Sequence, residues 1–359
     1  ANPSHQQLSN LLEHYKAGRL NEAEKLATSI SQDFPNHQFA WKVLGAVLGI
    51  KGRKSEAIDA NQTVVKLSPQ DAEAHNNLGN TLQDLDRLDE AKASYAQAIF
   101  LKPDYAEAHN NLGNTLKKLR RVNDALTSYT KAISLKPDLA LAHYNLGNTF
   151  KELERLDEAV ASYKQAIMFK PDLALAHYNL GNALKLLDRL DEAKTSYRQA
   201  IVLKPDYAEA HYNLGITLQE LGRLEESVVS YEQAIKLKSD YAEAHSNLGY
   251  TLKKIGRLEE SVVSYEQAIT LKPDYAEAHC NLGNTFKELG RLDESVASYE
   301  QAIKLKPDYA EAHKYLTSMK KFDRQDEQYS KMQELYLNKN ISEEQRCHIN
   351  FGLAKACED

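Results

Sequence analysis

Residues 72–105 read AEAHNNLGNTLQDLDRLDEAKASYAQAIFLKPDY, and this stretch decides the fold because its pattern recurs every 34 residues. Leucine marks the period without insertion or deletion, at Leu44, Leu78, Leu112, Leu146, Leu180, Leu214, Leu248, Leu282 and Leu316. Glycine follows the first eight of these leucines, and proline keeps the same period from Pro35 to Pro307, except at Ser239. A fixed period of this length is the signature of a repeat protein.

Each repeat is predicted to form two helices. Counting positions 1–34 within a repeat, the full repeats begin at Gln38, Ala72, Ala106, Ala140, Ala174, Ala208, Ala242 and Ala276. In the quoted repeat, apolar residues recur three or four apart, as on one helix face, at Ala74, Leu78, Leu82 and Leu85 and then at Ala91, Tyr95, Ala98 and Ile99. Pro103 ends the second helix because proline cannot continue one. The small Gly79 lets the two backbones approach, and Tyr95 is expected to fill the remaining gap.

Three motifs of this repeat, NNLGNTL (76–82), DEAKASYAQAI (89–99) and LKP (101–103), resemble the tetratricopeptide repeat, or TPR. The resemblance implies an all-α fold, an α-solenoid that winds as a right-handed superhelix of antiparallel helix pairs. It also implies that the first helix of each pair lines an inner groove. One departure is systematic: the family often has tryptophan at position 4, whereas here Trp41 is followed by histidines in the later repeats.

The pattern weakens at both ends, which divides the chain into three parts. Residues 1–37 are expected to form a degenerate N-terminal repeat that caps the array, because Leu11 occupies the glycine position. Residues 38–309 hold the eight full repeats, and residues 310–359 a degenerate repeat followed by a further helical segment. Because no partner helix follows, we expect the natural polypeptide to continue beyond Asp359, or else the uncapped end to support end-to-end self-association.

The composition excludes several classes of function. A net charge of -6, from 45 basic and 51 acidic residues, argues against a nucleic-acid partner, which would favour a basic surplus. No apolar run approaches the ~18 residues of a membrane span, so no membrane partner is expected. The cysteines Cys280, Cys347 and Cys357 are odd in number and lack CxxC spacing, which is typical of free thiols and predicts a cytoplasmic location.

No catalytic constellation is present, and the chain is predicted not to be an enzyme. The sequence lacks the nucleophile elbow, the phosphate-binding loops and the zinc-protease motif. Histidine recurs at position 4 from His75 to His313. Equivalent positions of stacked helices lie at least ~8–10 Å apart, so these histidines cannot converge on one ion. We expect structural histidines, no metal and no cofactor.

The first-helix face opposite the apolar stripe carries most of the candidate binding residues. Position 6 is asparagine at Asn77, Asn111, Asn145, Asn179, Asn213, Asn247 and Asn281, and position 9 adds Asn80, Asn114, Asn148, Asn182 and Asn284. A carboxamide donates and accepts, so such a row can pair with the backbone of an extended peptide. The row resembles the asparagine ladder in the TPR arm of O-GlcNAc transferase. The alternative is that these asparagines only solvate the surface or bind neighbouring backbone.

Other candidate residues interrupt the polar row in mid-array. Leu141 and Leu175 at position 2, and Tyr144, Tyr178 and Tyr212 at position 5, form an apolar and aromatic patch that is expected to anchor a partner. The alternative for the tyrosines is packing along their own helix. Lysines at position 12, among them Lys117 and Lys151, could attract carboxylates or simply be solvated. Position 5 carries no basic residue in the full repeats after the first, which argues against binding of a chaperone C-terminal tail.

Two hypotheses for the function follow. The first is a protein–protein interaction scaffold that binds a peptide segment in the groove. The second is the non-catalytic, substrate-recruiting arm of a larger transferase, because the array also resembles the TPR arms of O-GlcNAc transferase and of bacterial TPR proteins with a sulfotransferase-like domain.

Overall fold

The fold is an all-α solenoid, seen in a computed structural model that describes residues 2–319, 327–338 and 341–358. These residues form 21 helices and no strand. The helices before the full repeats are α1 (His5–Lys16) and α2 (Leu20–Asp33). The first helices of the full repeats are α3 (Gln38–Ile50), α5 (Ala72–Asp84), α7 (Ala106–Lys118), α9 (Ala140–Glu152), α11 (Ala174–Leu186), α13 (Ala208–Glu220), α15 (Ala242–Lys254) and α17 (Ala276–Glu288). Their second helices are α4 (Lys54–Leu67), α6 (Leu88–Leu101), α8 (Val122–Leu135), α10 (Leu156–Phe169), α12 (Leu190–Leu203), α14 (Leu224–Leu237), α16 (Leu258–Leu271) and α18 (Leu292–Leu305).

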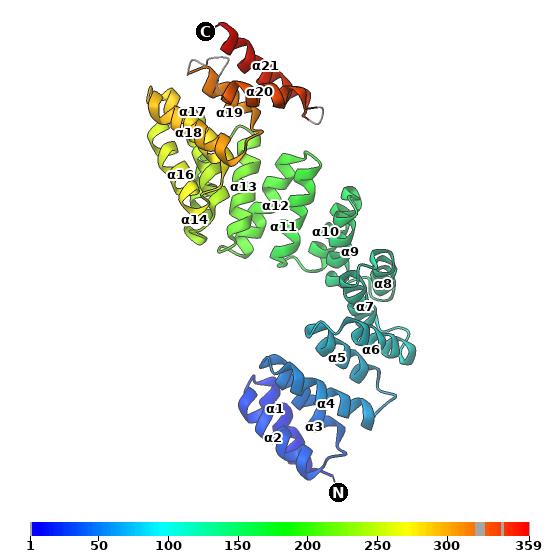
Figure 1. The fold of residues 1–359 in the computed structure, drawn as a ribbon. Coiled ribbons are helices and arrows are strands. Elements are labelled where there is room, and N and C mark those ends of the chain that lie inside the picture. The colour runs from blue at the N-terminus through cyan, green and yellow to red at the C-terminus, as the bar shows by residue number, and fades with distance from the viewer. Residues whose placement is uncertain (1, 320–326, 339–340, 359) are drawn as a thin grey trace. The chain divides into compact units, whose positions relative to one another are not determined.

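The helices gather into two compact units, residues 1–179 and residues 180–359. Within the N-terminal unit, each first helix packs on the second helix of its own repeat, as α5 does on α6 and α7 on α8 (Figure 1). First helices of successive repeats also touch, α5 with α7 and α7 with α9. The C-terminal unit repeats this arrangement from α13 to α18. Because only three residues join α5 to α6, the two helices are antiparallel neighbours.

The turn inside each repeat depends on one residue with left-handed backbone geometry. Glycine supplies it at Gly222, with φ of 72°, whereas Glu154 adopts φ of 59° with a full side chain. An arginine follows each of these residues and pairs with a carboxylate three residues on, as Arg87 does with Glu90 at 2.6 Å. The second helix therefore begins with an acidic first turn, which suits the positive end of its dipole.

A tyrosine at position 24 fills the space between the two helices, as the sequence predicts. Seven of these tyrosines are buried, namely Tyr95, Tyr129, Tyr163, Tyr197, Tyr231, Tyr265 and Tyr299. Each lies against the position-8 glycine of its own repeat: a Cβ placed on Gly113 would lie 2.6 Å from Cε1 of Tyr129. In the first full repeat Asn61 takes the tyrosine position and approaches Gly45 instead. The glycine is therefore required by a close approach rather than by the helix.

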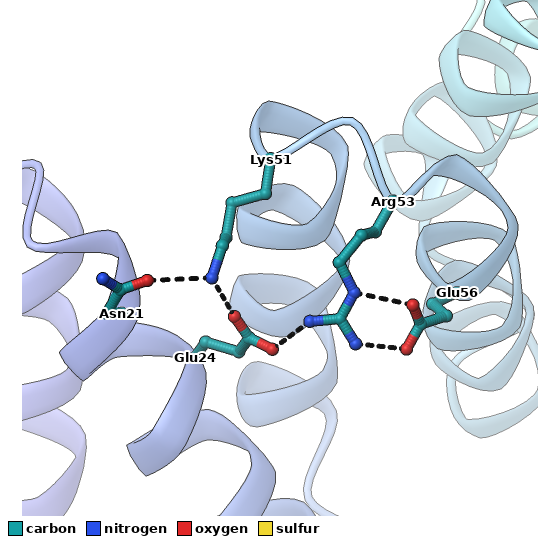
Figure 2. A network of polar contacts seen from close by, with 5 residues as sticks. All are labelled: Asn21, Glu24, Lys51, Arg53 and Glu56. Atoms are coloured by element: carbon teal, nitrogen blue, oxygen red, sulfur yellow. Dashed lines mark hydrogen bonds and ion pairs between the residues drawn. The ribbon is translucent and has the colours of Figure 1, made fainter.

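An ion-pair network joins α2 to the turn between α3 and α4 (Figure 2). Lys51 donates to Glu24 at 2.5 Å and to Asn21 at 2.9 Å. Arg53 bonds both Glu24 and Glu56 through its guanidinium group. The Glu24 side chain is 19% exposed, and its hydrogen bond from Lys51 holds its pKa below the ordinary value of 4.5. The network ties the N-terminal helix pair to the first full repeat.

We expect Glu24→Gln to loosen α2, with amide exchange in α2 several-fold faster than in the wild type. Because the pKa of Glu24 is lowered in the fold, its carboxylate stabilises the fold above pH 4.5, and this stabilisation is lost as the pH falls through the folded value. The wild type and the variant should therefore differ at neutral pH and converge in acid. Glu13→Gln, at an ion pair whose glutamate is 70% exposed, is the control. Equal effects of the two substitutions would contradict the prediction.

The C-terminal end is covered by helices that do not follow the repeat. Helix α21 (Glu343–Glu358) packs on both α19 (Ala310–Thr317) and α20 (Glu327–Leu337). Ala310, Met332 and Ile349 are buried in the cluster that results. Residues 320–326 and 339–340, which belong to the expected degenerate C-terminal repeat, lie outside the described residues. The exposed Phe351 lies on α21, and end-to-end association stays a prediction.

The structure also bears on the expectations about membrane spans and cysteines. Among the described residues, no helix combines the length and hydrophobicity that crossing a bilayer requires. Cys280 is buried and Cys347 exposed, both as free thiols, while the side chain of Cys357 lies outside the described part of the chain. Burial raises the pKa of the Cys280 thiol to about 12.

Candidate functional site

The position-9 asparagines are each held by the buried tyrosine of the same repeat. The tyrosine hydroxyl donates to the asparagine Oδ1 at 2.7–2.8 Å in five repeats. These pairs are Tyr95 with Asn80, Tyr129 with Asn114, Tyr163 with Asn148, Tyr197 with Asn182, and Tyr299 with Asn284. This role of the tyrosine was not predicted from the sequence, although both residues recur together in these five repeats.

The position-6 asparagines bond to the preceding repeat. Their Nδ2 atoms donate to position 5 or position 9 of that repeat, from Asn111 to Asn76 and Asn80, from Asn145 to Asn110, from Asn179 to Tyr144 and Asn148, from Asn213 to Asn182, and from Asn247 to Tyr212, all at 3.0–3.2 Å. Asn77 and Asn281 are half-buried like the others. This set of bonds joins neighbouring repeats through side chains, rather than through the neighbouring backbone considered from the sequence. Peptide binding by the position-6 asparagines stays a prediction.

Together these bonds orient the position-9 amides. Oδ1 of Asn148 accepts from Tyr163 and from Asn179, and Oδ1 of Asn80 accepts from Tyr95 and from Asn111. Because two donors point at each oxygen, the Nδ2 group must face the other way. Asn80 and Asn148 therefore present N–H donors, rather than a donor and an acceptor each, and the one donor at Oδ1 of Asn114, Tyr129, favours the same orientation there.

Several of the predicted binding residues line one recess in the N-terminal unit. Asn114, Asn145 and Asn148 line a cavity of about 670 Å³, together with Tyr129 and Lys117. Its walls come mainly from the first helices, of which α7 touches both α5 and α9, and from the turns that follow α5 and α7. The structure thus brings residues of both asparagine positions to a single concave surface.

The position-5 tyrosines are half-buried, and their rings and hydroxyls contact other side chains. Tyr144 lies 6.1 Å from the ring of Tyr163 and accepts from Asn179 through its hydroxyl. Tyr212 lies 4.7 Å from the ring of Tyr241, and burial raises the pKa of Tyr212 to about 12. Tyr178 is half-buried as well. The packing partners lie on the second helix or the next loop, which differs from the packing along their own helix considered from the sequence.

Leu141 and Leu175 are solvent-exposed apolar residues on the candidate surface. Their side chains are 49% and 48% exposed. In the repeat before that of Leu141, the same position 2 holds Glu107, which pairs with Lys136 at 2.8 Å. Leucine at this position removes the ion pair and leaves an apolar side chain in solvent. A large exposed apolar side chain gains free energy when a partner covers it.

The position-4 histidines have a structural partner that explains the departure from tryptophan. Nε2 of seven of them lies 2.8–3.3 Å from the carbonyl oxygen of the proline six residues earlier, namely His75, His109, His143, His177, His211, His279 and His313. Nε1 of Trp41 donates to Pro35 in the same way at 2.8 Å. Either ring thus ties the loop between repeats to the next helix. In the described part of the chain, no group of three or more potential ligands is placed to hold a metal ion.

Comparison with known proteins identifies the repeats. A family model described as TPR repeat matches residues 84–119, 121–154, 147–188, 181–222, 217–256, 251–290 and 283–316, and one described as Tetratricopeptide repeat matches residues 10–72. No curated protein matches the chain.

Several solved structures are similar to part of the chain. YrrB, described as a TPR protein with an unusual peptide-binding site, is 25% identical, with a TM-score of 0.48, over 51% of this chain and 95% of that one. MamA is 24% identical, with a TM-score of 0.45, over 46% and 96% of the two chains. The Cut9–Hcn1 complex is 14% identical, with a TM-score of 0.49, over 84% and 59%.

The family models cover well over half of the chain, and the helix pairs have the arrangement that the repeat requires. Repeats of this kind form scaffolds typical of protein–protein interaction and are generally non-catalytic. The chain belongs to the tetratricopeptide-repeat family.

Proposed function

We propose that the chain binds an extended peptide segment of a partner protein along the face formed by its first helices. The observation that carries the proposal is the orientation of the position-9 asparagines. Their oxygens are occupied by tyrosine hydroxyls, and their Nδ2 groups are left to donate. The row runs through consecutive repeats at Asn80, Asn114 and Asn148, and the last two line the recess in the N-terminal unit.

A row of donors fits the carbonyl oxygens of an extended backbone. A peptide in that conformation exposes one acceptor per residue and has no internal bonds to lose. Such pairing reads the backbone and not the side chains, so it supports binding to many sequences. Leu141 and Leu175 would add apolar contacts along the first-helix face of the N-terminal unit, with the half-buried Tyr144 and Tyr178 as its aromatic residues. The position-6 asparagines would hold the rows of neighbouring repeats in register.

The test uses Asn114→Asp together with Asn148→Asp. Aspartate keeps an oxygen for the tyrosine hydroxyl but replaces the outward N–H donor by an anionic oxygen, which repels a peptide carbonyl. Random peptides displayed on phage are selected against the wild-type chain, and the affinities of the enriched peptides are measured by fluorescence polarisation. We expect the double variant to bind them at least about tenfold more weakly, as the loss of two hydrogen bonds implies.

Two controls isolate the groove-facing atoms. Asn123→Asp makes the same kind of substitution on the exposed surface of the second helix α8, serves as the control for each single Asn→Asp variant, and should leave binding unchanged. Tyr163→Phe removes the hydroxyl behind Asn148 and should lower stability more than affinity. Failure to enrich any peptide, or equal affinity of the wild type and the double variant, would contradict the proposal.

A further inference from the structure

Three of the five position-12 lysines form an ion pair with the next repeat, and a fourth, Lys287, donates to the Ser318 hydroxyl at 3.3 Å. Lys117 lies 3.1 Å from Glu152, Lys185 3.6 Å from Glu220, and Lys253 2.9 Å from Glu288. Each partner is the position-13 glutamate of the following repeat. The corresponding residue for Lys151 is Leu186, which carries no charge. Within the described residues, Lys151 has no ion pair of its own.

The surroundings of Lys151 disfavour its charge. Its side chain is half-buried, and this burial lowers its pKa, with the charge of Lys117 lowering it further. The recess lined by α5, α7 and α9 holds three cations, Lys117, Lys118 and Arg120, and two acids. Lys117 pairs with Glu152 and Lys118 with Asp86, so the recess has one positive charge in excess. A local excess of positive charge therefore exists on a chain whose net charge is -6. An anion beside Lys151 would offset both the free-energy cost of burying its charge and the repulsion from Lys117.

We infer that Lys151, with Lys117 beside it, binds a carboxylate of the peptide that occupies the groove. The inference rests on the proposed function and adds the class of partner, an acidic peptide. Lys151 lies three residues after Asn148 on α9, so both residues lie on one face of that helix. The carboxylate therefore sits beside the amide that would hold the peptide backbone.

The geometry of an extended chain supports this placement. Successive side chains of an extended peptide point in opposite directions. Leu141 lies near the beginning of α9 and Lys151 near its end, about 15 Å apart along the helix at 1.5 Å per residue. A peptide that crosses α9 near Asn148 can thus direct an acidic side chain to Lys151 and its neighbouring, apolar side chain towards Leu141.

The test selects random short peptides on phage against the full wild-type chain and against Lys151→Met. Methionine keeps the length of the side chain and removes the charge. We expect aspartate and glutamate to be enriched by the wild type and not by Lys151→Met, and an enriched peptide to lose about tenfold in affinity for the variant. Lys253→Met is the matched control, because that lysine already pairs with Glu288, and it should leave the acidic preference unchanged.

Stability and synthetic peptides separate the outcomes. Lys151→Met removes a half-buried unpaired charge, so its thermal midpoint should not fall, and weaker binding cannot then be ascribed to unfolding. Peptides with Glu→Gln or with an amidated C-terminus distinguish a side-chain carboxylate from a terminal one; loss with either supports the inference. Enrichment without any carboxylate preference overturns this inference alone, whereas no enrichment at all overturns the proposed function together with it.

Discussion

Replacing Gly113 by alanine is expected to destabilise the N-terminal unit by about 1–3 kcal/mol, as for overpacking of a filled core. The added Cβ would lie 2.6 Å from Cε1 and 2.8 Å from Cδ1 of Tyr129, and this ring is buried between the two helices. The ring cannot move away without losing its hydroxyl bond to Asn114. Alanine also has a helix propensity about 1 kcal/mol more favourable than that of glycine, which acts in the opposite direction. A net loss of stability therefore means that the steric clash with Tyr129 outweighs this gain.

Gly49→Ala is the matched control for this substitution. Gly49 is also within a first helix, but a Cβ there would meet nothing within 4 Å. We expect the control to be neutral or stabilising by up to about 1 kcal/mol. Because repeat arrays unfold in parts, native-state hydrogen exchange of α7 and α8 is a better measure than a single melting temperature. Equal effects of the two substitutions would show that the glycine–tyrosine contact does not limit the packing.

Tyr265→Phe is expected to leave stability unchanged or to raise it, whereas Tyr299→Phe should lower it by about 1 kcal/mol. The two tyrosines hold the same position in successive repeats, and both are buried. Tyr299 donates to Asn284 at 2.8 Å, whereas the Tyr265 hydroxyl has no hydrogen-bond partner among the described residues. The cause is Tyr250, which stands where the other repeat has asparagine. An unpaired buried hydroxyl costs about 1–3 kcal/mol.

Restoring the acceptor tests the same explanation from the other side. Tyr250→Asn should stabilise the C-terminal unit by about 1 kcal/mol, because Tyr265 then gains the partner that Tyr299 already has. Combining Tyr250→Asn with Tyr265→Phe should remove this gain in stability, because the phenylalanine has no hydroxyl to donate to the new asparagine. Thermal and denaturant unfolding of the four variants provides the comparison. A loss of stability in Tyr265→Phe as large as in Tyr299→Phe would contradict the prediction.

Tyr231 shows how a repeat with a different position-9 residue adapts. Its position-9 residue is Ile216, and the Tyr231 hydroxyl donates instead to Gln219 at 3.2 Å. In the repeat of Tyr265 the residue equivalent to Gln219 is Lys253, which carries no acceptor and pairs with Glu288. The missing bond of Tyr265 therefore follows from two substitutions in one repeat.

The sequence by itself determined the helices and their pairing. The spacing of Ala74, Leu78 and Leu82 predicts the buried face of α5, and Pro103 predicts where α6 ends. Both are local signals, because helix periodicity and the geometry of proline act within a few residues. The close approach of Gly79 to Tyr95 was also predictable, since both lie in one repeat.

Only the tertiary structure decided which atoms the candidate surface presents. Oδ1 of Asn148 is taken by Tyr163 of the same repeat and Asn179 of the next, 15 and 31 residues away. No local sequence pattern predicts whether Oδ1 or Nδ2 of the asparagine faces outward, because that depends on donors from two other helices. The same holds for Lys151, whose lack of a partner depends on a residue of another repeat. Helix formation is a local property, whereas hydrogen-bond satisfaction depends on neighbours that packing brings together.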